Sequence, residues 1–464
     1  MTKKRQGKCA VFDAGKTFAK VSIVGSDGQV WAERRTATPY LNTLLYRAFD
    51  SDRLFAWLLD QLKELGQHYA IDRIMPVAHG AACAFLDEQE TLIQPVQDYE
   101  ARIPEPYASA YRQIRPDFSE TCSPALPDGL NLGAQIHWHA RRDPEAFQRV
   151  RWILPYPQYW AWRLSGVLSS EVTSLGCHTD LWSPRTGGFS SLARNEGWDG
   201  RFAPLRHAWD RLGSLRTDIA KAAGLPPNVQ VCAGLHDSNA ALAASLLSGG
   251  PMPAVLSTGT WFVAMAPGAP LQGLQAERDC LVAVDVFGRP VPCARFMGGR
   301  TFDVITGGHT DVPVDADSLS AIIRDGGLAM PNFVEAGGPF PGRRGEIRNL
   351  NRDTPEARAA LGLLYLAMLS TECLGLIQAG DSLLVEGAAA RNETLCRLIA
   401  ALHDGPVLVN DGVSGVTRGA AALAFYGEND VPAVTGRRVR PMLRQEVRAY
   451  RHLWHSALGE PIAA

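Results

Sequence analysis

The chain has 464 residues, which is too long for one ordinary hydrophobic core, so we expect two domains and at most three. Its 46 Lys and Arg residues nearly balance its 48 Asp and Glu residues, and the formal net charge of -2 gives no reason to expect binding to nucleic acid or to an acidic membrane. No uninterrupted apolar run of about 18 residues is present, and the apolar run near the N-terminus is too short for a signal peptide. We therefore expect a cytoplasmic globular protein that spans no membrane and whose partners are small molecules, with a homodimer left open.

Nine cysteines are spread singly along the chain, at positions such as Cys9, Cys83, Cys177, Cys232 and Cys396. An odd number without CxxC spacing predicts buried reduced thiols and argues against a disulfide framework or a zinc site. The one close pair of histidines, "HWH" at 137–139, would point in different directions on a helix, so we expect no metal site there.

The first motif in chain order is "VFDAGKTFAK", residues 11–20, in which Gly-Lys-Thr follows an apolar run. A P-loop would need a glycine five positions before the glycine of this triplet and a helix after it, but that position holds Ala10. The residues that follow alternate between apolar and small or polar types, and Asp27 and Gly28 signal a tight turn. We therefore predict two antiparallel strands joined by a short turn, then a hairpin and a third strand.

The turn between the first two strands is a candidate phosphate site of another kind. Gly15 would let the backbone approach an anion, Thr17 offers a hydroxyl and an amide, and Asp13 could hold a metal ion through its water shell. Turns of this composition also join strands in proteins that bind no ligand, so the motif alone leaves both interpretations open.

The segment 51–70 has the spacing of an amphipathic helix, with Ser51 or Asp52 as its N-cap. The leucines that would share its buried face are Leu54, Leu58, Leu62 and Leu65. Two more strands are expected around His79 and Gly80. Strands that alternate with helices predict an α/β domain with a mixed sheet.

The segment from about 95 to 150 is rich in proline, and we expect irregular loops that line a pocket. Residues 150–174 then carry closely spaced aromatic rings and predict a buried helix. Core packing is the default role of these rings, and one or two of them remain candidates for contact with a ligand.

A candidate catalytic base lies in "VCAGLHDSNAALAAS", where a strand ends at Gly234 and a helix begins at His236 and Asp237. Phosphoryl transfer requires positioning, charge stabilisation and one group that orients the nucleophile, and Asp237 could accept the proton of an attacking hydroxyl. The alternative is that Asp237 only caps the helix. Both roles are compatible, because a helix N-terminus stabilises an ionised carboxylate.

The segment "PAVLSTGTWFVAM", residues 253–265, repeats the opening plan of strand, Gly/Thr turn and strand. The Ser-Gly-Gly-Pro tract before it breaks the preceding helix, which predicts one domain over 1–248 and a second over 249–464. We expect a duplicated fold whose two phosphate-binding hairpins face one cleft.

Residues 381–410 predict a strand, a turn of small residues, a helix and another strand. Gly387 and the alanines after it would let a planar group approach the backbone, at the start of a helix that Asn392 or Thr394 caps. Such turns also occur without a ligand, so this segment does not decide its own role.

Taken together, "FDAGKTFAK", "GLHDSNAA", "STGTW" and "LLVEGAAARNETL" followed by "GAAALA" resemble the FGGY family of carbohydrate kinases over nearly the whole chain. The style of the motifs is most similar to the rhamnulokinase and fuculokinase branch. The resemblance implies an α/β fold of two actin-like, ribonuclease-H-like domains around a central cleft, which close on ATP, Mg²⁺ and a small sugar or polyol.

By this resemblance, Asp13 is the metal-associated aspartate and Asp237 is the catalytic base. The residues implied to contact ATP, the last two at its adenosine, are Gly15, Lys16, Thr17, Thr258, Gly259, Thr260, Gly387 and Asn392. The residues implied to contact the sugar are His79, Gly80, Asp98, His236 and Asp237. The implied reaction is ATP-dependent phosphorylation of a hydroxyl of a ketose, of the rhamnulose, fuculose, xylulose or ribulose type.

The sequence departs from the family pattern in two places. Three alanines follow Gly387 where relatives often have further glycines, which puts the nucleotide preference in doubt. Tyr99 follows Asp98, and the basic residue that relatives place close behind comes later, at Arg102, which puts the sugar in doubt. An actin-like nucleotide-binding regulator and a kinase homologue without turnover are the alternatives.

Overall fold

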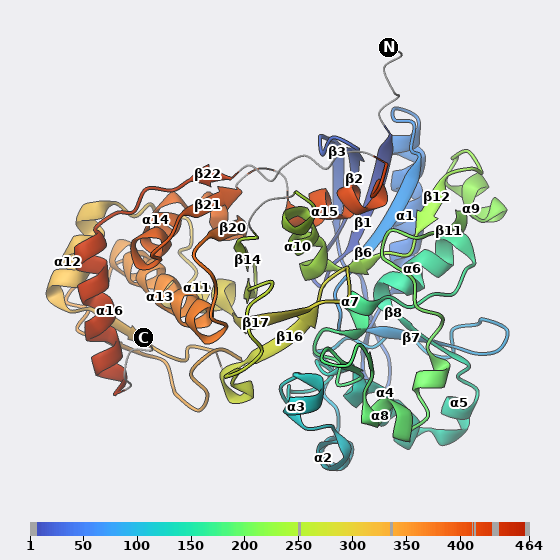
Figure 1. Cartoon of the computed structure of the whole chain (residues 1–464), viewed down its shortest axis with the longest axis horizontal. Helices are drawn as coiled ribbons and strands as arrows, with labels where there is room; N and C mark the ends of the chain where they lie inside the picture. Colours follow the sequence, from blue (N-terminus) through green and yellow to red (C-terminus); the bar gives the residue numbers. More distant parts are fainter. Residues whose placement is uncertain are drawn as a thin grey trace. The chain divides into compact units, whose positions relative to one another are not determined.

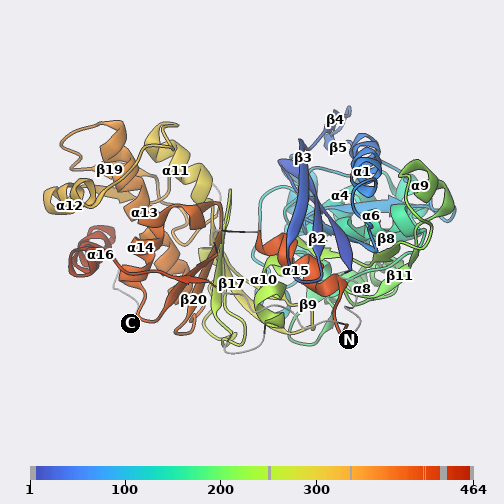
Figure 2. The same ribbon diagram turned by 90° about the horizontal axis from the view of Figure 1, so that it is seen from above.

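The computed structural model describes residues 7–248, 252–334, 337–410, 412, 414–428 and 436–459. They form two compact units, and each is described by itself (Figures 1 and 2). Unit 1 consists of Met1–Gly249, Val282–Pro290 and Gly415–Val434, and unit 2 consists of Gly250–Leu281, Val291–Ser414 and Thr435–Ala464. The sequence predicted a division into 1–248 and 249–464. The structure differs from it because Val282–Pro290 and Gly415–Val434, which follow the predicted boundary, belong to unit 1.

Unit 1 is built on a mixed sheet in the order β11-β12-β6-β1-β2-β3, with β13 beside β6. Its strands are β1 (Lys8–Ala14), β2 (Phe18–Gly25), β3 (Val30–Ala37), β6 (Arg73–Ala78), β11 (Arg211–Ser214), β12 (Gln230–Cys232) and β13 (Leu235–His236). β1 pairs antiparallel with β2 and parallel with β6. A strand therefore follows the Gly-Lys-Thr turn, as predicted, and not the helix of a P-loop.

Helices cover both faces of this sheet, as Figures 1 and 2 show: α1 (Ser51–Gly66) and α6 (Tyr156–Ser165) on one side, α10 (Asp237–Leu247) and α15 (Gly415–Ala424) on the other. Successive residues of β1 point to opposite faces of the sheet. Phe12 packs in the core on the side of α1 and α6, and Val11 packs in the core on the side of α10 and α15. A Cβ at Gly419 of α15 would overlap the carbonyl oxygen of Ala240 in α10. This close approach of two small-residue helices explains why Gly415–Val434 belongs to unit 1.

Helix α1 confirms the predicted leucine face, because Leu54, Leu58, Leu62 and Leu65 are all buried. The predicted N-cap was wrong by one or two positions. The cap is Asp50, whose carboxylate accepts a hydrogen bond from the backbone N–H of Arg53 at 3.0 Å. The rule that short polar side chains cap helices holds, and only the exact position differs.

The region 95–150 contains helices, so the prediction of irregular loops was wrong. The helices are α2 (Glu105–Ile114), α3 (Phe118–Thr121), α4 (Leu132–Arg142) and α5 (Pro144–Gln148). Pro104 is the N-cap of α2, and Pro144 is the first residue of α5. A proline at a helix start removes no hydrogen bond, so these prolines begin helices where the sequence suggested breaks.

The remaining elements of unit 1 are short. They are β4 (Tyr40–Asn42), β5 (Arg47–Phe49), β7 (Cys83–Leu86), β8 (Trp152–Pro155), α7 (Val172–Leu175), β9 (Trp182–Ser183), β10 (Gly188–Phe189), α8 (Ser191–Asn195), η1 (Asp199–Arg201) and α9 (Thr217–Ala222). All nine cysteines of the chain are buried and none forms a disulfide bond among the described residues, which confirms the prediction of buried thiols.

Unit 2 repeats the strand plan of unit 1, in the order β16-β17-β15-β14-β20-β21-β22. Its strands are β14 (Ala254–Thr258), β15 (Phe262–Met265), β16 (Cys280–Val284), β17 (Pro290–Phe296), β18 (Leu328–Met330), β19 (Glu346–Arg348), β20 (Leu383–Gly387), β21 (Val407–Asn410) and β22 (Arg437–Arg438). β14 pairs antiparallel with β15 and parallel with β20, as β1 does with β2 and β6. The duplication predicted from two hairpins therefore extends to the whole sheet.

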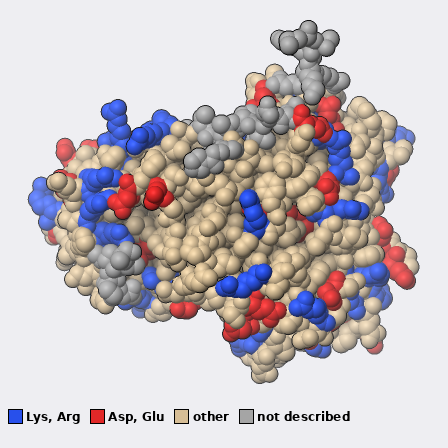
Figure 3. Space-filling view, in the orientation of Figure 1, with Lys and Arg blue, Asp and Glu red and all other residues tan. Residues whose placement is uncertain are grey.

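The helices of unit 2 are η2 (Ala276–Arg278), α11 (Gly298–Thr306), α12 (Ala316–Asp325), α13 (Pro355–Leu376), η3 (Ala388–Arg391), α14 (Glu393–Leu402) and α16 (Arg444–Leu458). Among the described residues, α13 alone has the length and apolarity of a membrane span, and 83% of that apolar stretch is buried in the fold, as in a core helix. On the face shown in Figure 3, acidic and basic side chains lie near one another.

Lower pH is expected to destabilise unit 1 through its buried histidines. Burial lowers the pKa of His139 in α4 to about 3, so below pH 6.5 the unfolded chain binds a proton that the folded chain does not. Stability is therefore lost as the pH falls from about 6.5 towards 3, by about 1.4 kcal/mol per pH unit for this group. Urea unfolding of the wild type and of His139→Gln between pH 6 and pH 4.5 should give a shallower pH dependence for the variant. An equal dependence would contradict this assignment.

Candidate active site

The predicted sugar and metal residues of unit 1 meet at one edge of its sheet. β1, β6 and β13 run parallel, with Ala14 opposite Ala78 and Ala78 opposite His236. Their carboxyl ends therefore carry Asp13, His79 and His236 to the same edge, which is where ligands bind in open α/β sheets. The sequence placed these residues far apart, and the parallel register brings them together.

The turn at residues 15–17 is a candidate phosphate site because of its backbone hydrogen bonds. Its three carbonyls accept hydrogen bonds, Gly15 from the Thr38 hydroxyl at 2.7 Å, Lys16 from the Tyr40 hydroxyl at 2.6 Å and Thr17 from the Thr38 amide at 3.0 Å. The amides of the same three residues have no acceptor among the described residues. A Cβ at Gly15 would lie 2.7 Å from a backbone oxygen, so only glycine fits. A turn with fixed carbonyls and free amides suits an anion such as phosphate.

Asp13 lies at the end of β1 on the side of α10, because it alternates with Val11. Burial raises its pKa to about 6, while Lys20, directly opposite on β2, opposes the increase and Asp237 adds to it. The carboxylate has no hydrogen bond or ion pair among the described residues. A half-buried carboxylate with no partner among the described residues favours a cation beside it.

These residues fit a magnesium ion. The described residues contain no group of three or more His, Cys, Asp or Glu that could hold a metal ion. Mg²⁺ needs no such group, because it keeps several waters and binds through one or two carboxylates together with substrate phosphates. Asp13 can supply that carboxylate.

Asp237 is the first residue of α10, and 32% of its side chain is exposed. Its Oδ1 accepts hydrogen bonds from the Ser238 amide at 2.6 Å and the Ser238 hydroxyl at 3.2 Å, and His236 Nε2 lies 3.2 Å away. Oδ2 has no partner among the described residues. One oxygen is therefore held in place while the other is available, and the helix N-terminus favours the ionised form.

His236 is held in a fixed orientation next to Asp237. Its backbone N–H donates to the Thr173 hydroxyl at 3.0 Å, and that hydroxyl donates to the buried carboxylate of Glu171 at 2.5 Å. Asn239 faces His236 Nδ1 at 3.3 Å, which leaves Nε2–H to donate to Asp237. Burial lowers the pKa of His236, so the ring is neutral.

The predicted Gly80 is required by this packing. A Cβ at Gly80 would lie 2.8 Å from Cδ2 of His236 and 2.6 Å from the sulfur of Cys177. Only glycine therefore lets the imidazole of His236 lie against this loop, and Gly80 acts on the site by close approach.

His79 is the clearest candidate for a ligand contact in unit 1. It is 7% exposed, and neither ring nitrogen has a hydrogen-bond partner among the described residues. Its ring packs among Phe49, Tyr99 and Tyr156, with centroid distances of 5.1, 5.2 and 5.1 Å. Burial lowers its pKa to about 4, so the imidazole is neutral and offers one donor and one acceptor. Buried polar atoms are normally satisfied, so these nitrogens indicate a missing polar partner.

Asp98, predicted to contact the sugar, is fully buried and already satisfied. One carboxylate oxygen pairs with Lys16 and the other with Arg47. The arginine that pairs with Asp98 is Arg47, and Arg102 does not pair with it. Lys16, predicted beside the phosphates, has its ammonium group on Asp98 and Glu100.

The sequence did not reveal Gln135, which links two loops of this site. It lies buried on α4, and its amide group donates to the carbonyl of Ala81 at 2.9 Å and to that of Gly129 at 2.5 Å. Ala81 follows His79 and Gly80, and the amide of Gly129 donates to the carbonyl of Tyr99 at 3.0 Å. One side chain therefore fixes the loops that carry His79 and Tyr99.

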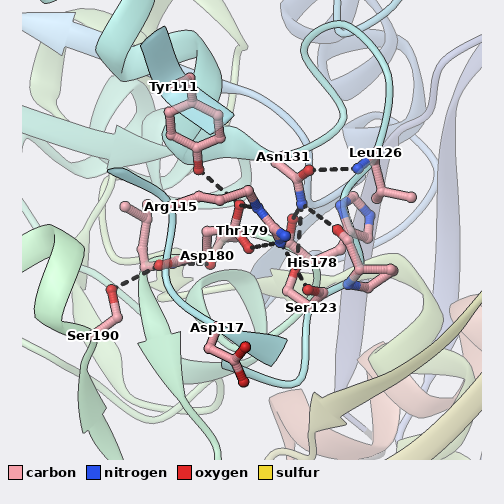
Figure 4. Close-up of polar contacts among 12 residues, drawn as sticks. Tyr111, Arg115, Asp117, Ser123, Leu126, Asn131, His178, Thr179, Asp180 and Ser190 are labelled. Atoms are coloured by element: carbon pink, nitrogen blue, oxygen red, sulfur yellow. Dashed lines mark hydrogen bonds and ion pairs between the residues drawn. The ribbon is translucent and has the colours of Figure 1, made fainter. Parts of the chain in front are cut away.

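Helix α4 is itself anchored by a buried polar network, shown in Figure 4. Asn131, at its N-terminus, donates to the Ser123 hydroxyl at 3.1 Å and to the His178 carbonyl at 3.0 Å. Asp180 accepts from the Tyr111 hydroxyl at 2.7 Å and pairs with Arg115 at 2.9 Å. These bonds fasten the helices of region 105–142 to the segment that follows α7.

We expect Gln135→Leu to weaken sugar binding more than nucleotide binding. The change leaves two buried carbonyls without a donor, which costs about 1–3 kcal/mol and loosens both loops. Steady-state kinetics should show a higher KM for sugar and an unchanged KM for ATP. Gln230→Leu provides the control, because the hydrogen bonds of the Gln230 amide, to the Ser214 hydroxyl and the Asn228 carbonyl, are exposed. Equal sugar KM values for the variant and the wild type would contradict the role.

In unit 2 the second predicted phosphate turn joins β14 and β15. Thr260 is exposed, and Gly259 donates its amide to the Trp261 carbonyl at 2.9 Å. The hydroxyl of Thr258 is occupied, because it donates to the Glu386 carbonyl at 2.6 Å and accepts from the Ala389 amide at 3.0 Å. Thr258 therefore ties this turn to the end of β20, and Thr260 is the threonine with an accessible hydroxyl.

The predicted adenosine segment lies against the same turn. Gly387 has a φ of 92°, and a Cβ there would overlap the carbonyl oxygen of Thr258. Asn392 caps α14, as one of the two predicted candidates, and accepts from the Leu395 amide at 2.9 Å. Of the three alanines after Gly387, Ala390 is buried in the core, so its methyl group does not narrow a surface slot. Unit 2 thus joins the end of β14, at Thr258, to Gly387 and Ala389 in the predicted adenosine segment.

Two family models match the chain: the N-terminal domain of the FGGY family of carbohydrate kinases over residues 9–244, and the C-terminal domain of the same family over residues 251–432. The chain belongs to the FGGY family of carbohydrate kinases. This membership confirms the resemblance read from the motifs. It implies ATP as co-substrate and a sugar as acceptor.

Individual relatives of this FGGY chain agree with the assignment. A solved carbohydrate kinase from Novosphingobium aromaticivorans is 39% identical, covers 98% of this chain and 99% of its own, and has a TM-score of 0.86. A xylulose kinase from Lactobacillus acidophilus, 13% identical with a TM-score of 0.80 over 98% of both chains, shows the shared fold.

L-fuculokinases from Haemophilus influenzae and Salmonella typhi are 24% and 26% identical to the chain. The matches cover 55% and 56% of this chain and 57% of each fuculokinase, so they span a little over half the length of these curated relatives. The fuculokinases belong to the branch that the motifs resemble.

Proposed function

We propose that the protein is a kinase that transfers the γ-phosphate of ATP to a primary hydroxyl of a small ketose. Unit 1 carries the sugar-binding residues, the base, the metal-associated carboxylate and the first phosphate turn. Unit 2 carries the second phosphate turn and the adenosine segment. One observation carries the proposal. Asp237, whose Oδ2 is available, and His79, whose ring nitrogens have no partner among the described residues, lie at the same edge of the sheet.

Asp237 orients the sugar hydroxyl and takes its proton on Oδ2. As the oxygen–phosphorus bond forms, the bond between the γ-phosphorus and the bridging oxygen of ATP breaks, and ADP leaves with that electron pair. His236 and Ser238 hold Oδ1, so the carboxylate does not rotate away from the hydroxyl.

The neutral imidazole of His79 donates a hydrogen bond to one sugar hydroxyl and accepts one from another, while the ring of Tyr99, which is only partly buried, covers the apolar face of the sugar. The amides of the turn at 15–17 and the hydroxyl of Thr17 bind phosphate oxygens. Mg²⁺, held near Asp13, would supply positive charge to the phosphates.

The substrate panel for this proposal contains L-fuculose, L-rhamnulose, D-xylulose, D-ribulose, glycerol and D-gluconate. ADP release by the purified protein with Mg²⁺-ATP should rise at least about tenfold above the sugar-free rate with one of the ketoses. An equal ADP release with and without every member of the panel would contradict the proposal. That result would favour the nucleotide-binding regulator or the homologue without turnover.

A further inference from the structure

Lys16 belongs to the phosphate turn by its backbone, but its side chain is held by the sugar-binding residues. Its ammonium group pairs with Asp98 and lies 3.3 Å from Glu100. It also lies 4.4 Å from the ring centroid of Tyr99, and the same ring contacts His79 at a centroid distance of 5.2 Å. Tyr99 is therefore shared by Lys16 and the unpartnered histidine.

Two further rings complete the surroundings of this ammonium group. The centroids of Tyr40 and Phe49 lie 5.5 and 5.7 Å away. A cation near several aromatic rings is stabilised by the negative electrostatic potential of their faces, which comes from the ring quadrupole. This stabilisation is stronger when the cation is partly removed from water. The side chain of Lys16 is 18% exposed, which meets that condition.

Asp98 fixes Lys16 in this position. The side chain of Asp98 is fully buried and forms ion pairs with Lys16 and Arg47. It also accepts a hydrogen bond from the Glu100 amide at 3.1 Å. Removal of one partner from a buried ion pair is strongly unfavourable, because the remaining charge stays in a medium of low polarity. Lys16 cannot leave Asp98 for an ATP phosphate without that penalty.

We propose that Lys16 is a specificity residue of the sugar pocket, not a ligand of the ATP phosphates, and that it selects a neutral sugar. The proposal rests on the function proposed above and deepens it. An ammonium group has three donors. One bonds to Asp98 and a second faces Glu100 as an ion pair, so one remains for a sugar hydroxyl.

The local charges explain the preference for a neutral substrate. Lys16 and Arg47 are the cations of this cluster, and Asp98 and Glu100 are its carboxylates. The carboxylate of an aldonate would need a cation of its own, and neither cation here is unpaired. A neutral polyol chain needs only hydrogen bonds.

The test measures sugar binding without ATP, by titration calorimetry of the full chain with the ketose that the wild type phosphorylates fastest. Lys16→Met should raise the Kd of that sugar about tenfold or more, the effect of losing a hydrogen bond from a charged group. The KM of Mg²⁺-ATP should change by less than about twofold, because the backbone amide at position 16 is retained. Wild-type Kd should be higher for D-gluconate than for the ketose.

Three variants keep the result interpretable. The double variant Lys16→Met with Asp98→Asn removes the pair together, so no buried carboxylate is left unpaired, and it should show the same loss of sugar affinity. Lys16→Arg keeps the charge but changes the donor geometry, and it should bind the sugar more weakly than the wild type. Lys221→Met, on the surface of α9, should match the wild type in every readout.

A raised KM for Mg²⁺-ATP with an unchanged sugar Kd in Lys16→Met would overturn the proposal, as would tighter wild-type binding of D-gluconate. A wild type that binds ATP but no sugar would remove the proposed function itself. Equal sugar Kd values for the wild type and Lys16→Met are a different outcome, which would remove only the role of Lys16.

Discussion

Replacement of Asp237 by Asn is expected to lower kcat for sugar phosphorylation by about 10²- to 10⁴-fold, the typical contribution of a general base. An amide keeps the size of the side chain and the hydrogen bonds of its oxygen with Ser238 and His236, but it cannot take a proton. Initial rates of ADP formation with saturating sugar and ATP measure kcat, and calorimetric titrations of each substrate report binding. Both affinities should stay within about threefold of the wild type.

Asp60→Asn is the matched control, because Asp60 lies exposed on α1 and forms no described hydrogen bond or ion pair. It should leave kcat unchanged. An Asp237→Asn enzyme with wild-type kcat would remove Asp237 from its role as base. A variant that loses sugar binding instead would make Asp237 a binding residue only.

Replacement of Gly387 by Ala is expected to raise the KM of ATP by at least about tenfold. The positive φ of 92° costs an alanine about 1–3 kcal/mol, and the added Cβ would overlap the Thr258 carbonyl, so the end of β20 must move. That movement breaks the bond between the Ala389 amide and the Thr258 hydroxyl and displaces the turn beside Thr260. Steady-state kinetics with varied ATP, together with thermal unfolding, measure the two consequences.

Gly380→Ala is the control for this substitution. Gly380 lies shortly before β20, has no heavy atom within 4 Å of an added Cβ and has no positive φ. This variant should match the wild type in the KM of ATP and in thermal stability. A Gly387→Ala protein with unchanged values of both would show that the turn tolerates the methyl group and does not border the nucleotide.

The sequence predicted those parts of the fold that depend on local patterns. The two Gly/Thr turns lie between alternating apolar runs, and hairpin rules identify both. Because the turns recur in the two halves, the duplicated sheet could be inferred before any contact was known. The position of Asp237 was predicted for a similar reason, since the strand before it runs directly into a helix and so places its carboxylate at the helix N-terminus.

The remaining features depend on tertiary contacts. Lys16 stands in a phosphate motif, and only the position of Asp98, 82 residues later, turns its side chain towards Tyr99. Gln135 lies on α4, in a region that was predicted as loops because of its prolines. Its partners are backbone carbonyls, which every residue type has, so the sequence does not identify them. Helix α15 belongs to unit 1 because Gly419 lets it approach α10 closely. The sequence pattern of α15 does not show which helix it packs against.

The central claim is that the protein transfers phosphate to a sugar, and phosphorus NMR of the complete reaction tests it most directly. With Mg²⁺-ATP and the most active ketose of the panel, the account predicts one new phosphomonoester signal that grows in equal amount with ADP. With Asp237→Asn the signal should grow at least about 100-fold more slowly under the same conditions. Growth of inorganic phosphate in place of a sugar phosphate would contradict the account and show that water, not a sugar hydroxyl, receives the phosphate.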